Sequence, residues 1–342
     1  MTLLHGLKGR LRLPLIGSPL FIVSVPELVV AQCCAGVIGS MPSLNARPVE
    51  QLDEWLSEIR ARLAAHDAAH PDRPAAPFAI NLIVHRSNDR LEQDLALCVK
   101  HRVPLVITSL GARPEVFAAV QGYGGHVLHD VINQDFAHKA VEKGADGLVL
   151  VAAGAGGHAG TQSPFALLQE TRRWFDGPLA LSGAIASGRG ILAAEAMGAD
   201  FAYMGSAFIA TEEARAVPDY KQMLVEAGAG DIVLHQPDHR RAWQLPEALA
   251  APRRAGPGQF ARLRPQRHGF RQRPQEALEG DLGRGAERVR HRRGAPGRRA
   301  GGQAARGILG GAARPRRGLA PAQPGLDAGG LTARRLFFRL AA

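Results

Sequence analysis

The feature that most constrains the fold is the regular alternation of short apolar runs with longer amphipathic segments over residues 1–234. Each run is rich in β-branched and apolar residues, and the segment after it carries apolar residues at helical spacing with charges opposite them. The pattern predicts eight strands, at residues 13–19, 36–42, 78–84, 104–111, 125–131, 147–157, 178–185 and 200–208.

This alternation predicts parallel strands joined by crossover helices, because parallel strands cannot be linked by a tight turn. Helices are predicted within residues 49–66, 90–102, 134–144 and 189–198, and the last two segments end at a glycine suited to a helix C-terminus. Eight such units in about 210 residues predict a (β/α)8 barrel. The alternative is a doubly wound open sheet, but no GxGxxG motif follows the first strand.

Charge separates the chain into two regions. Residues 1–234 hold 19 Lys and Arg against 24 Asp and Glu, a net charge of −5, whereas residues 235–342 hold 23 Arg, no Lys and 7 Asp and Glu, a net charge of +16. The overall charge of +11 therefore comes from the last third. A mildly acidic barrel has no electrostatic reason to bind nucleic acid.

The three cysteines, Cys33, Cys34 and Cys98, are too few to form a disulfide framework in a chain of this length. Adjacent Cys33 and Cys34 are predicted to be small core residues. Neither a signal peptide nor a run long enough to span a membrane is visible, so we expect a soluble cytoplasmic protein without membrane contact.

In a (β/α)8 barrel the reactive groups lie where the strands end. The positions selected by this rule are poor in carboxylates and contain no metal-ligand cluster, so we expect no metal. A Ser–His–Asp hydrolase is disfavoured, because no serine lies in a nucleophile elbow. These positions are Gly17–Pro19, Ser40–Met41, Asn81, Thr108–Ser109, His129–Asp130, Gly154–His158, Ser182–Gly183 and Gly205–Ser206.

Two glycine-bearing loops, residues 181–190 and 203–208, follow the last two predicted strands. Barrels commonly bind phosphate there, and small residues let backbone N–H groups approach its oxygens. His158 follows Gly156–Gly157 after the sixth strand, where a histidine with an ordinary pKa could serve as a general base. His129 is a second candidate, for which an orienting or structural role is expected.

The segments GAGGHAGTQSPFAL (154–167) and LSGAIASGRGILAAEAMGADFAYMGSAFIAT (181–211) resemble the nitronate monooxygenase family, formerly called 2-nitropropane dioxygenases. The resemblance covers residues 11–234 and implies an FMN-dependent barrel. One departure lies at the end of the sixth strand, where some members have Gln and this chain has Val151 or Ala152. The positions implied for FMN binding are Asn81, Gly156, Gly157, Ser182, Gly183, Ala184, Gly205 and Ser206, and His158 occupies the catalytic position.

The activity implied is the oxidation of alkyl nitronates or nitroalkanes by O2 to carbonyl compounds and nitrite, with His158 as the base. Relatives in the same superfamily are NAD(P)H-dependent FMN reductases of quinones or enoyl thioesters, and this alternative stays open. The small-molecule substrate and O2 are the only partners expected.

Residues 235–342 have the composition of GC-rich codons read without selection: Arg, Gly, Ala and Pro dominate, and Ser, Asn, Lys, Tyr, Met and Cys are absent. A one-base shift of LHQPDHRRAWQLPEA (234–248) permits YTSLITGVHGNYLKP, which resembles the C-terminal part of the same family. We therefore predict an out-of-frame tail that is disordered or poorly packed, and the barrel could be an inactive remnant as a result. The alternative is an Arg-rich arm that binds nucleic acid.

Overall fold

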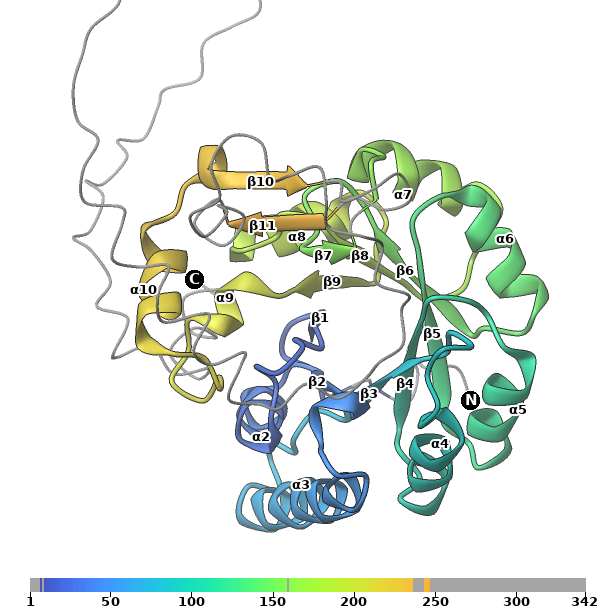
Figure 1. The fold of residues 1–342 in the computed structure, drawn as a ribbon, viewed down its shortest axis with the longest axis vertical. Coiled ribbons are helices and arrows are strands. Elements are labelled where there is room, and N and C mark those ends of the chain that lie inside the picture. Colours follow the sequence, from blue (N-terminus) through green and yellow to red (C-terminus); the bar gives the residue numbers. More distant parts are fainter. Residues whose placement is uncertain (1–6, 8, 159, 236–242, 247–342) are drawn as a thin grey trace, which may run out of the picture.

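The computed structural model describes residues 7, 9–158, 160–235 and 243–246, and the predicted tail lies mostly outside them. Within the described residues, eight parallel strands form one sheet whose neighbours follow chain order, as Figure 1 shows. The strands are β1 (Leu15–Gly17), β2 (Gly39–Pro42), β3 (Phe78–Ile83), β4 (Leu105–Ser109), β5 (His126–Val131), β6 (Gly147–Val151), β8 (Leu179–Ser182) and β9 (Phe201–Met204).

The sheet closes on itself between its first and last members. Ile38, just before β2, donates its N–H to Leu15 O of β1 at 3.0 Å and accepts the N–H of Gly17 at 2.8 Å. Together with the parallel pairing of β1 and β9, these bonds complete the ring. The predicted (β/α)8 barrel is thereby confirmed, with each strand inside its predicted segment.

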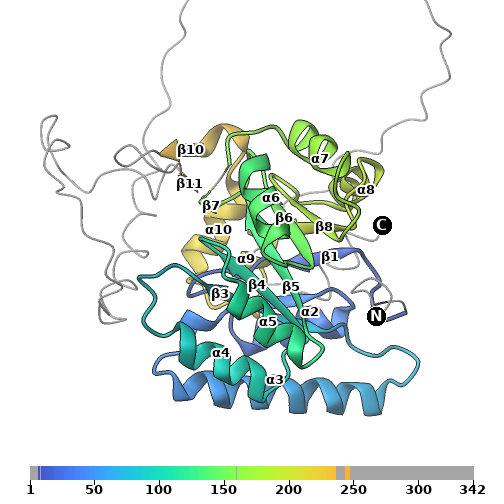
Figure 2. The same ribbon diagram turned by 90° about the vertical axis from the view of Figure 1, so that its right-hand side faces the viewer.

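Helices cover the outer side of the strands in Figure 1 and, after a quarter turn, in Figure 2. Gly144 and Gly198 follow α6 and α8 with φ of +97° and +104°, as expected for glycines that end helices. The helices are α2 (Pro26–Ala35), α3 (Glu50–Ala69), α4 (Leu91–Lys100), α5 (Pro114–Gly122), α6 (Gln134–Glu142), α7 (Pro164–Arg172), α8 (Gly188–Ala196), α9 (Ser206–Ile209) and α10 (Pro218–Glu226), with single 3-10 turns η1 (Ser43–Asn45) and η2 (Ala229–Asp231).

Alternation along each strand divides the core into two layers. On β5, Val127 faces the helices, whereas Leu128 belongs to a separate cluster that fills the barrel. That interior cluster includes Ile16, Ile38, Ala79, Leu105, Ile107, Leu128, Val149, Ala180, Phe201 and Tyr203. Residues two positions further along a strand, toward its carboxyl end, therefore point into the mouth of the barrel.

A second, small antiparallel sheet was not predicted. It is formed by β7 (Gly157–His158), β11 (Trp243–Pro246) and β10 (Ile232–His235), and the backbone of His158 pairs with that of Trp243. A two-residue strand inside a glycine-rich loop has no periodicity that a sequence could reveal. β11 lies beyond residue 234, the boundary expected from composition.

Cys33 and Cys34 lie in or beside the core, as predicted. Cys33 and Cys98 are buried, Cys34 is half-buried, and all three are free thiols. Burial raises the pKa of Cys33 to about 12, so this thiol stays protonated and unreactive. No helix in the described part of the chain combines the length and apolar character needed to cross a bilayer.

Candidate active site

The carboxyl ends of β8 and β9 present backbone rather than large side chains. Gly183 follows Ser182 with φ of +143°, and a Cβ placed on Gly183 would lie 2.7 Å from Ala153 O. Ala184, with φ of +52°, donates its N–H to Gly154 O at 3.0 Å. Glycine at position 183 is therefore needed both for its conformation and for the close approach of the loop after β6.

The end of β9 lies beside that of β8, since Ser182 pairs with Tyr203. Gly205 is half-buried and Ser206 is exposed at the start of α9. Ser18, from the loop after β1, donates its N–H to Met204 O at 2.8 Å and closes the other flank. The structure thus brings together four of the predicted positions, Gly183, Ala184, Gly205 and Ser206.

The loop after β6 carries His158 at its tip. Ala153 donates its N–H to Gln162 O at 2.8 Å, which joins the two stems of the loop. A Cβ on Gly160 would overlap Val151 O, and Gly154 and Gly157 have φ of +91° and +74°. Glycine is required at positions 154 and 157 for their conformation and at position 160 for the close approach of Val151 O. Gly156 is exposed at the same tip.

Asn81 lies on the other side of the mouth, at an inward position of β3. Its Nδ2 donates to Ile107 O at 3.0 Å and to Ser109 Oγ at 2.8 Å. Ser109 Oγ in turn donates to Asp130 Oδ2 at 2.5 Å. Three adjacent strands, β3, β4 and β5, therefore share one chain of hydrogen bonds that runs from Asn81 to Asp130.

The other carboxyl oxygen, Asp130 Oδ1, is inaccessible to solvent and has no hydrogen-bond partner in the part of the chain that the structure describes. Burial raises the pKa of Asp130 to about 7, against the lowering effect of the bond from Ser109. Tyr203 lies inside the barrel, and its pKa is raised well above its usual range by burial and by the charge of Asp130. The strand pattern predicts Asp130 at a strand end but cannot predict its unpartnered oxygen, which depends on the neighbouring strands.

His129 points away from the mouth. Its Nδ1 lies 2.7 Å from Thr108 Oγ1, and its ring packs edge-on against Phe117 of α5 with the centroids 6.0 Å apart. The side chain is buried, and burial lowers its pKa to about 4. His129 is therefore a neutral residue of the layer between barrel and helices, and the strand alternation separates it from Asp130.

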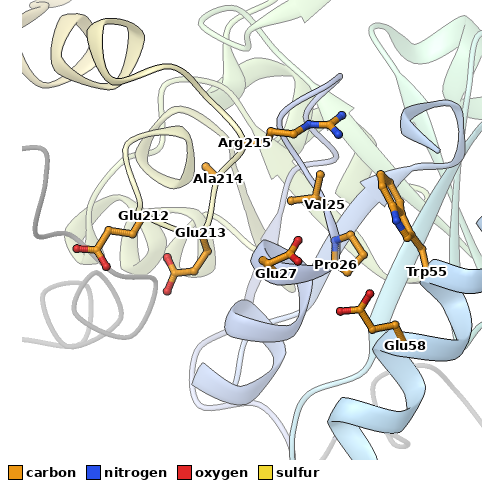
Figure 3. Close-up of a pocket in the computed structure, with 9 residues that line it drawn as sticks. All are labelled: Val25, Pro26, Glu27, Trp55, Glu58, Glu212, Glu213, Ala214 and Arg215. Carbon is orange, nitrogen blue, oxygen red and sulfur yellow. The ribbon is translucent and has the colours of Figure 1, made fainter. Parts of the chain in front are cut away.

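A cavity of about 380 Å³ lies elsewhere, between α2, α3 and the segment after α9, as Figure 3 shows. Arg215 lies over the ring of Trp55, 6.0 Å from its centroid, among the carboxylates of the wall. None of the predicted site residues lines this cavity. The carboxylates that line it are Glu27, Glu58, Glu212 and Glu213.

Residues 10–245 match the family described as nitronate monooxygenase. The chain belongs to this family. The match extends eleven residues past the boundary expected at 234. The family is one of flavin-dependent oxidoreductases, so the predicted enzyme class and fold agree with this membership.

Individual relatives of this nitronate monooxygenase family member are distant. A probable nitronate monooxygenase of Bacillus subtilis is 33% identical over 66% of this chain and 74% of its own length. An octahydro-indene-carboxyl-CoA dehydrogenase of Rhodococcus jostii is 26% identical over 65% of this chain, and the match spans only 59% of that enzyme. The solved structure of FabK from Thermotoga maritima superposes with a TM-score of 0.63 at 25% identity, covering 72% of this chain and 74% of that one.

Proposed function

We propose that this chain is an FMN-dependent enzyme that oxidises alkyl nitronates and nitroalkanes with O2 to carbonyl compounds and nitrite. The observation that carries the proposal is the family match over residues 10–245, which contains every loop at the barrel mouth. The substrate and O2 are small molecules, and the net charge of −5 over residues 1–234 gives no electrostatic reason to bind a nucleic acid.

In this proposal the ends of β8 and β9 hold the FMN phosphate. Gly183, Ala184, Gly205 and Ser206 are half-buried or exposed, so their backbone can reach a ligand. Glycine brings N–H groups close to phosphate oxygens, and such groups prefer anions. A side chain at position 183 would press on Ala153 O of the loop after β6, so the glycine holds these two loops together at this end.

The ring and ribityl chain of FMN would lie across the mouth, between Ser182, Gly156 and Gly157 on one side and Asn81 on the other. The exposed Gly156 has no side chain to block a flat ligand. When bound, FMN supplies the electron acceptor for the reaction.

His158 would act as the base. Its backbone lies in the glycine-rich loop after β6, and a neutral imidazole there could accept the α-proton of a neutral nitroalkane near pH 7. A nitronate is already anionic and needs no base. His158 therefore matters for one form of the substrate and not for the other.

Replacing His158 with Asn tests this assignment. General base catalysis contributes about 10²- to 10⁴-fold, so we expect the variant to lose at least about 100-fold in kcat/KM on neutral nitroethane and only a few-fold on its nitronate. Oxygen consumption and nitrite release give the two rates. Equal losses on both forms would show that His158 does not act as the base.

A second function, NAD(P)H-dependent reduction of quinones or enoyl thioesters, is favoured by one observation, the similarity to a dehydrogenase that acts on a CoA thioester. Anaerobic mixing with NADH separates the two functions. Rapid bleaching of the flavin absorbance would establish a reductase, whereas an unchanged spectrum together with nitronate oxidation supports the monooxygenase.

We also propose that residues 1–234 form the FMN-binding domain and that residues 235–342 are an out-of-frame extension. The composition of the tail and the family-like phrases in the shifted frame support this division. Sequencing the gene across codon 234 tests it, because the second-base frame must encode those phrases. A purified chain that stays colourless with FMN would instead identify an inactive remnant.

A further inference from the structure

Three arginines gather at the rim of the barrel, and the proposed function uses none of them. Arg47 lies between β2 and α3, Arg90 between β3 and α4, and Arg215 after β9 and α9. All three therefore belong to loops that follow the carboxyl ends of strands, on the face of the barrel that carries the mouth. We call them the rim arginines.

The loop after β1 brings Arg47 and Arg215 together, because they contact neighbouring residues of it. The guanidinium carbon of Arg47 lies 5.5 Å from the centre of the Phe21 ring. Arg215 Nε donates to the carbonyl oxygen of the next residue, Ile22, at 2.9 Å. Arg47 Nε donates to Leu44 O at 3.0 Å. Each guanidinium group is thus anchored through Nε, which leaves its two terminal nitrogens able to donate to a ligand.

Arg47 and Arg215 are not paired with carboxylates in the described part of the chain, and both residues are exposed. Arg90 differs, since its Nη2 donates to Asp94 Oδ1 at 2.8 Å and its Nη1 donates to Ala46 O at 2.7 Å. Partial burial, together with the charges of Arg90 and Arg215, lowers the pKa of Arg47. Positive charge is therefore concentrated here, although residues 1–234 have a net charge of −5.

The carboxylates near Arg215 are those of the cavity in Figure 3, on α2, α3 and the segment after α9. In that view the guanidinium group of Arg215 is turned away from all four of them. The charges that shift the pKa of Arg47 are those of the other two rim arginines. The terminal nitrogens of Arg47 and Arg215 are thus left to an anion from solution.

We propose that Arg47 and Arg215 form a binding site for a diphosphate group, the part that a pyridine nucleotide and a coenzyme A thioester have in common. The end of a guanidinium group presents two parallel N–H groups that match the oxygens of a phosphate, and two such groups match two phosphates. A single carboxylate would occupy only one of them. The site goes beyond the proposed oxidation, because neither a nitronate nor O2 carries a phosphate, and it would serve the reductase function instead.

The test is the dissociation constant of inorganic pyrophosphate for the full-length chain without flavin, measured by tryptophan fluorescence. Trp55 reports on the site, because Arg215 lies 6.0 Å from the centre of its ring. The part of the signal that Trp55→Phe removes comes from this site and not from the 23 arginines beyond residue 234. We expect Arg47→Gln and Arg215→Gln each to weaken binding by about 10-fold or more, because each loses hydrogen bonds from a charged donor.

Arg102 offers the matched control. Its Nη2 donates to Tyr123 O at 2.8 Å, but it lies between α4 and β4, at the opposite end of the barrel. Arg102→Gln should bind pyrophosphate within about twofold of the wild type. Arg47→Lys keeps the charge and loses the paired N–H groups, so it should recover only part of the affinity that Arg47→Gln loses. Thermal unfolding shows that each variant is folded.

Equal affinities in Arg47→Gln and Arg102→Gln would overturn the site, as would a wild type without a signal from Trp55. Oxidised pyridine nucleotide and coenzyme A, titrated in the same way, identify the source of the diphosphate, because the affinity of the true ligand falls in Arg47→Gln. If the affinity of neither falls, the assignment to a coenzyme is wrong and the site takes small anions only.

These titrations contain no flavin, so their result does not depend on the FMN site. A chain that binds pyrophosphate through Arg47 but does not bind FMN would refute the proposed oxidation alone. A chain that binds FMN and oxidises nitronates, but binds pyrophosphate equally well in Arg47→Gln, would refute the diphosphate site alone.

Discussion

The two sides of the barrel mouth are built from different parts of the chain. At the ends of β8 and β9 the surface is made mainly of backbone. Gly183 has φ of +143°, and Ala184 donates its N–H to Gly154 O. At β3, β4 and β5, side chains form the surface, in the chain from Asn81 through Ser109 to Asp130.

In the proposed FMN site the two sides would meet different portions of the ligand. At the ends of β8 and β9, small residues leave half-buried or exposed backbone, which suits a phosphate. At β3, β4 and β5, the surface is made of polar side chains, which suit a ring. Changes on the two sides should therefore affect FMN binding in different ways.

The largest effect is expected from Gly183→Val, which disturbs the backbone at the end of β8. The added Cβ would lie 2.7 Å from Ala153 O, and a β-branched residue is strained at this φ. We expect FMN binding to weaken by at least about 100-fold, because the loop after β8 must move to relieve the clash and the strain, and the proposed phosphate site moves with it. Fluorescence titration with FMN measures the loss.

Gly144→Val is the matched control. Gly144 also has positive φ, +97°, but lies at the end of α6 with open space around it. Gly144→Val should lose stability through its backbone conformation alone and keep FMN, whereas Gly183→Val adds the clash with Ala153 O and should lose FMN as well. Equal FMN affinities in the two variants would contradict a phosphate site at β8.

The backbone side could be predicted from the sequence because its residues are contiguous, in LSGAIASGRG and YMGSAF. The barrel could be predicted for the same reason, since each strand–helix unit carries its own pattern. The side-chain network could not be predicted in this way. Asn81, Ser109 and Asp130 are separated by 28 and 21 residues, and only the register of β3, β4 and β5 joins them.

Strand β5 shows the same limit of prediction from sequence, because the sequence does not reveal which face of a strand points inward. HVLHDV contains two neighbouring polar residues, His129 and Asp130, and the sequence does not say which of them faces the mouth. The register of the whole barrel decides it, because a shift by one residue exchanges the two faces. The small sheet of β7, β10 and β11 was missed for a different reason: its strands are too short to show a period.

On the side-chain side, the titration of Asp130 should make stability depend on pH. Because the pKa of Asp130 is raised from 3.8 to about 7, folding favours the protonated form, and the wild type loses stability as pH rises from about 4 to about 7. Asp130→Asn should therefore be more stable than the wild type at pH 8, by at most about 4 kcal/mol at 1.36 kcal/mol per pKa unit. At pH 4 the two proteins should be nearly equal.

Urea unfolding of the flavin-free proteins at both pH values measures this difference. An excess stability of Asp130→Asn that is the same at pH 4 and pH 8 would show that the carboxyl group does not titrate in this range. Because the backbone side contains no titrating group, Gly183→Val should show the wild-type pH dependence of stability.

The smallest effect is expected from His129→Gln, which changes the neighbour of Asp130 on the outer face of the same strand. The pKa of His129 is lowered from 6.5 to about 4 by burial, so its neutral form is favoured by folding, and stability is lost as pH falls below about 6.5. Between pH 7.5 and pH 5 the wild type should lose about 2 kcal/mol through this group, and the variant should not. FMN affinity should stay within about twofold of the wild type, because the ring packs on Phe117 and bonds to Thr108 rather than to a ligand. A variant that lost FMN while keeping its stability would place His129 at the mouth and overturn the assignment of the two faces of β5.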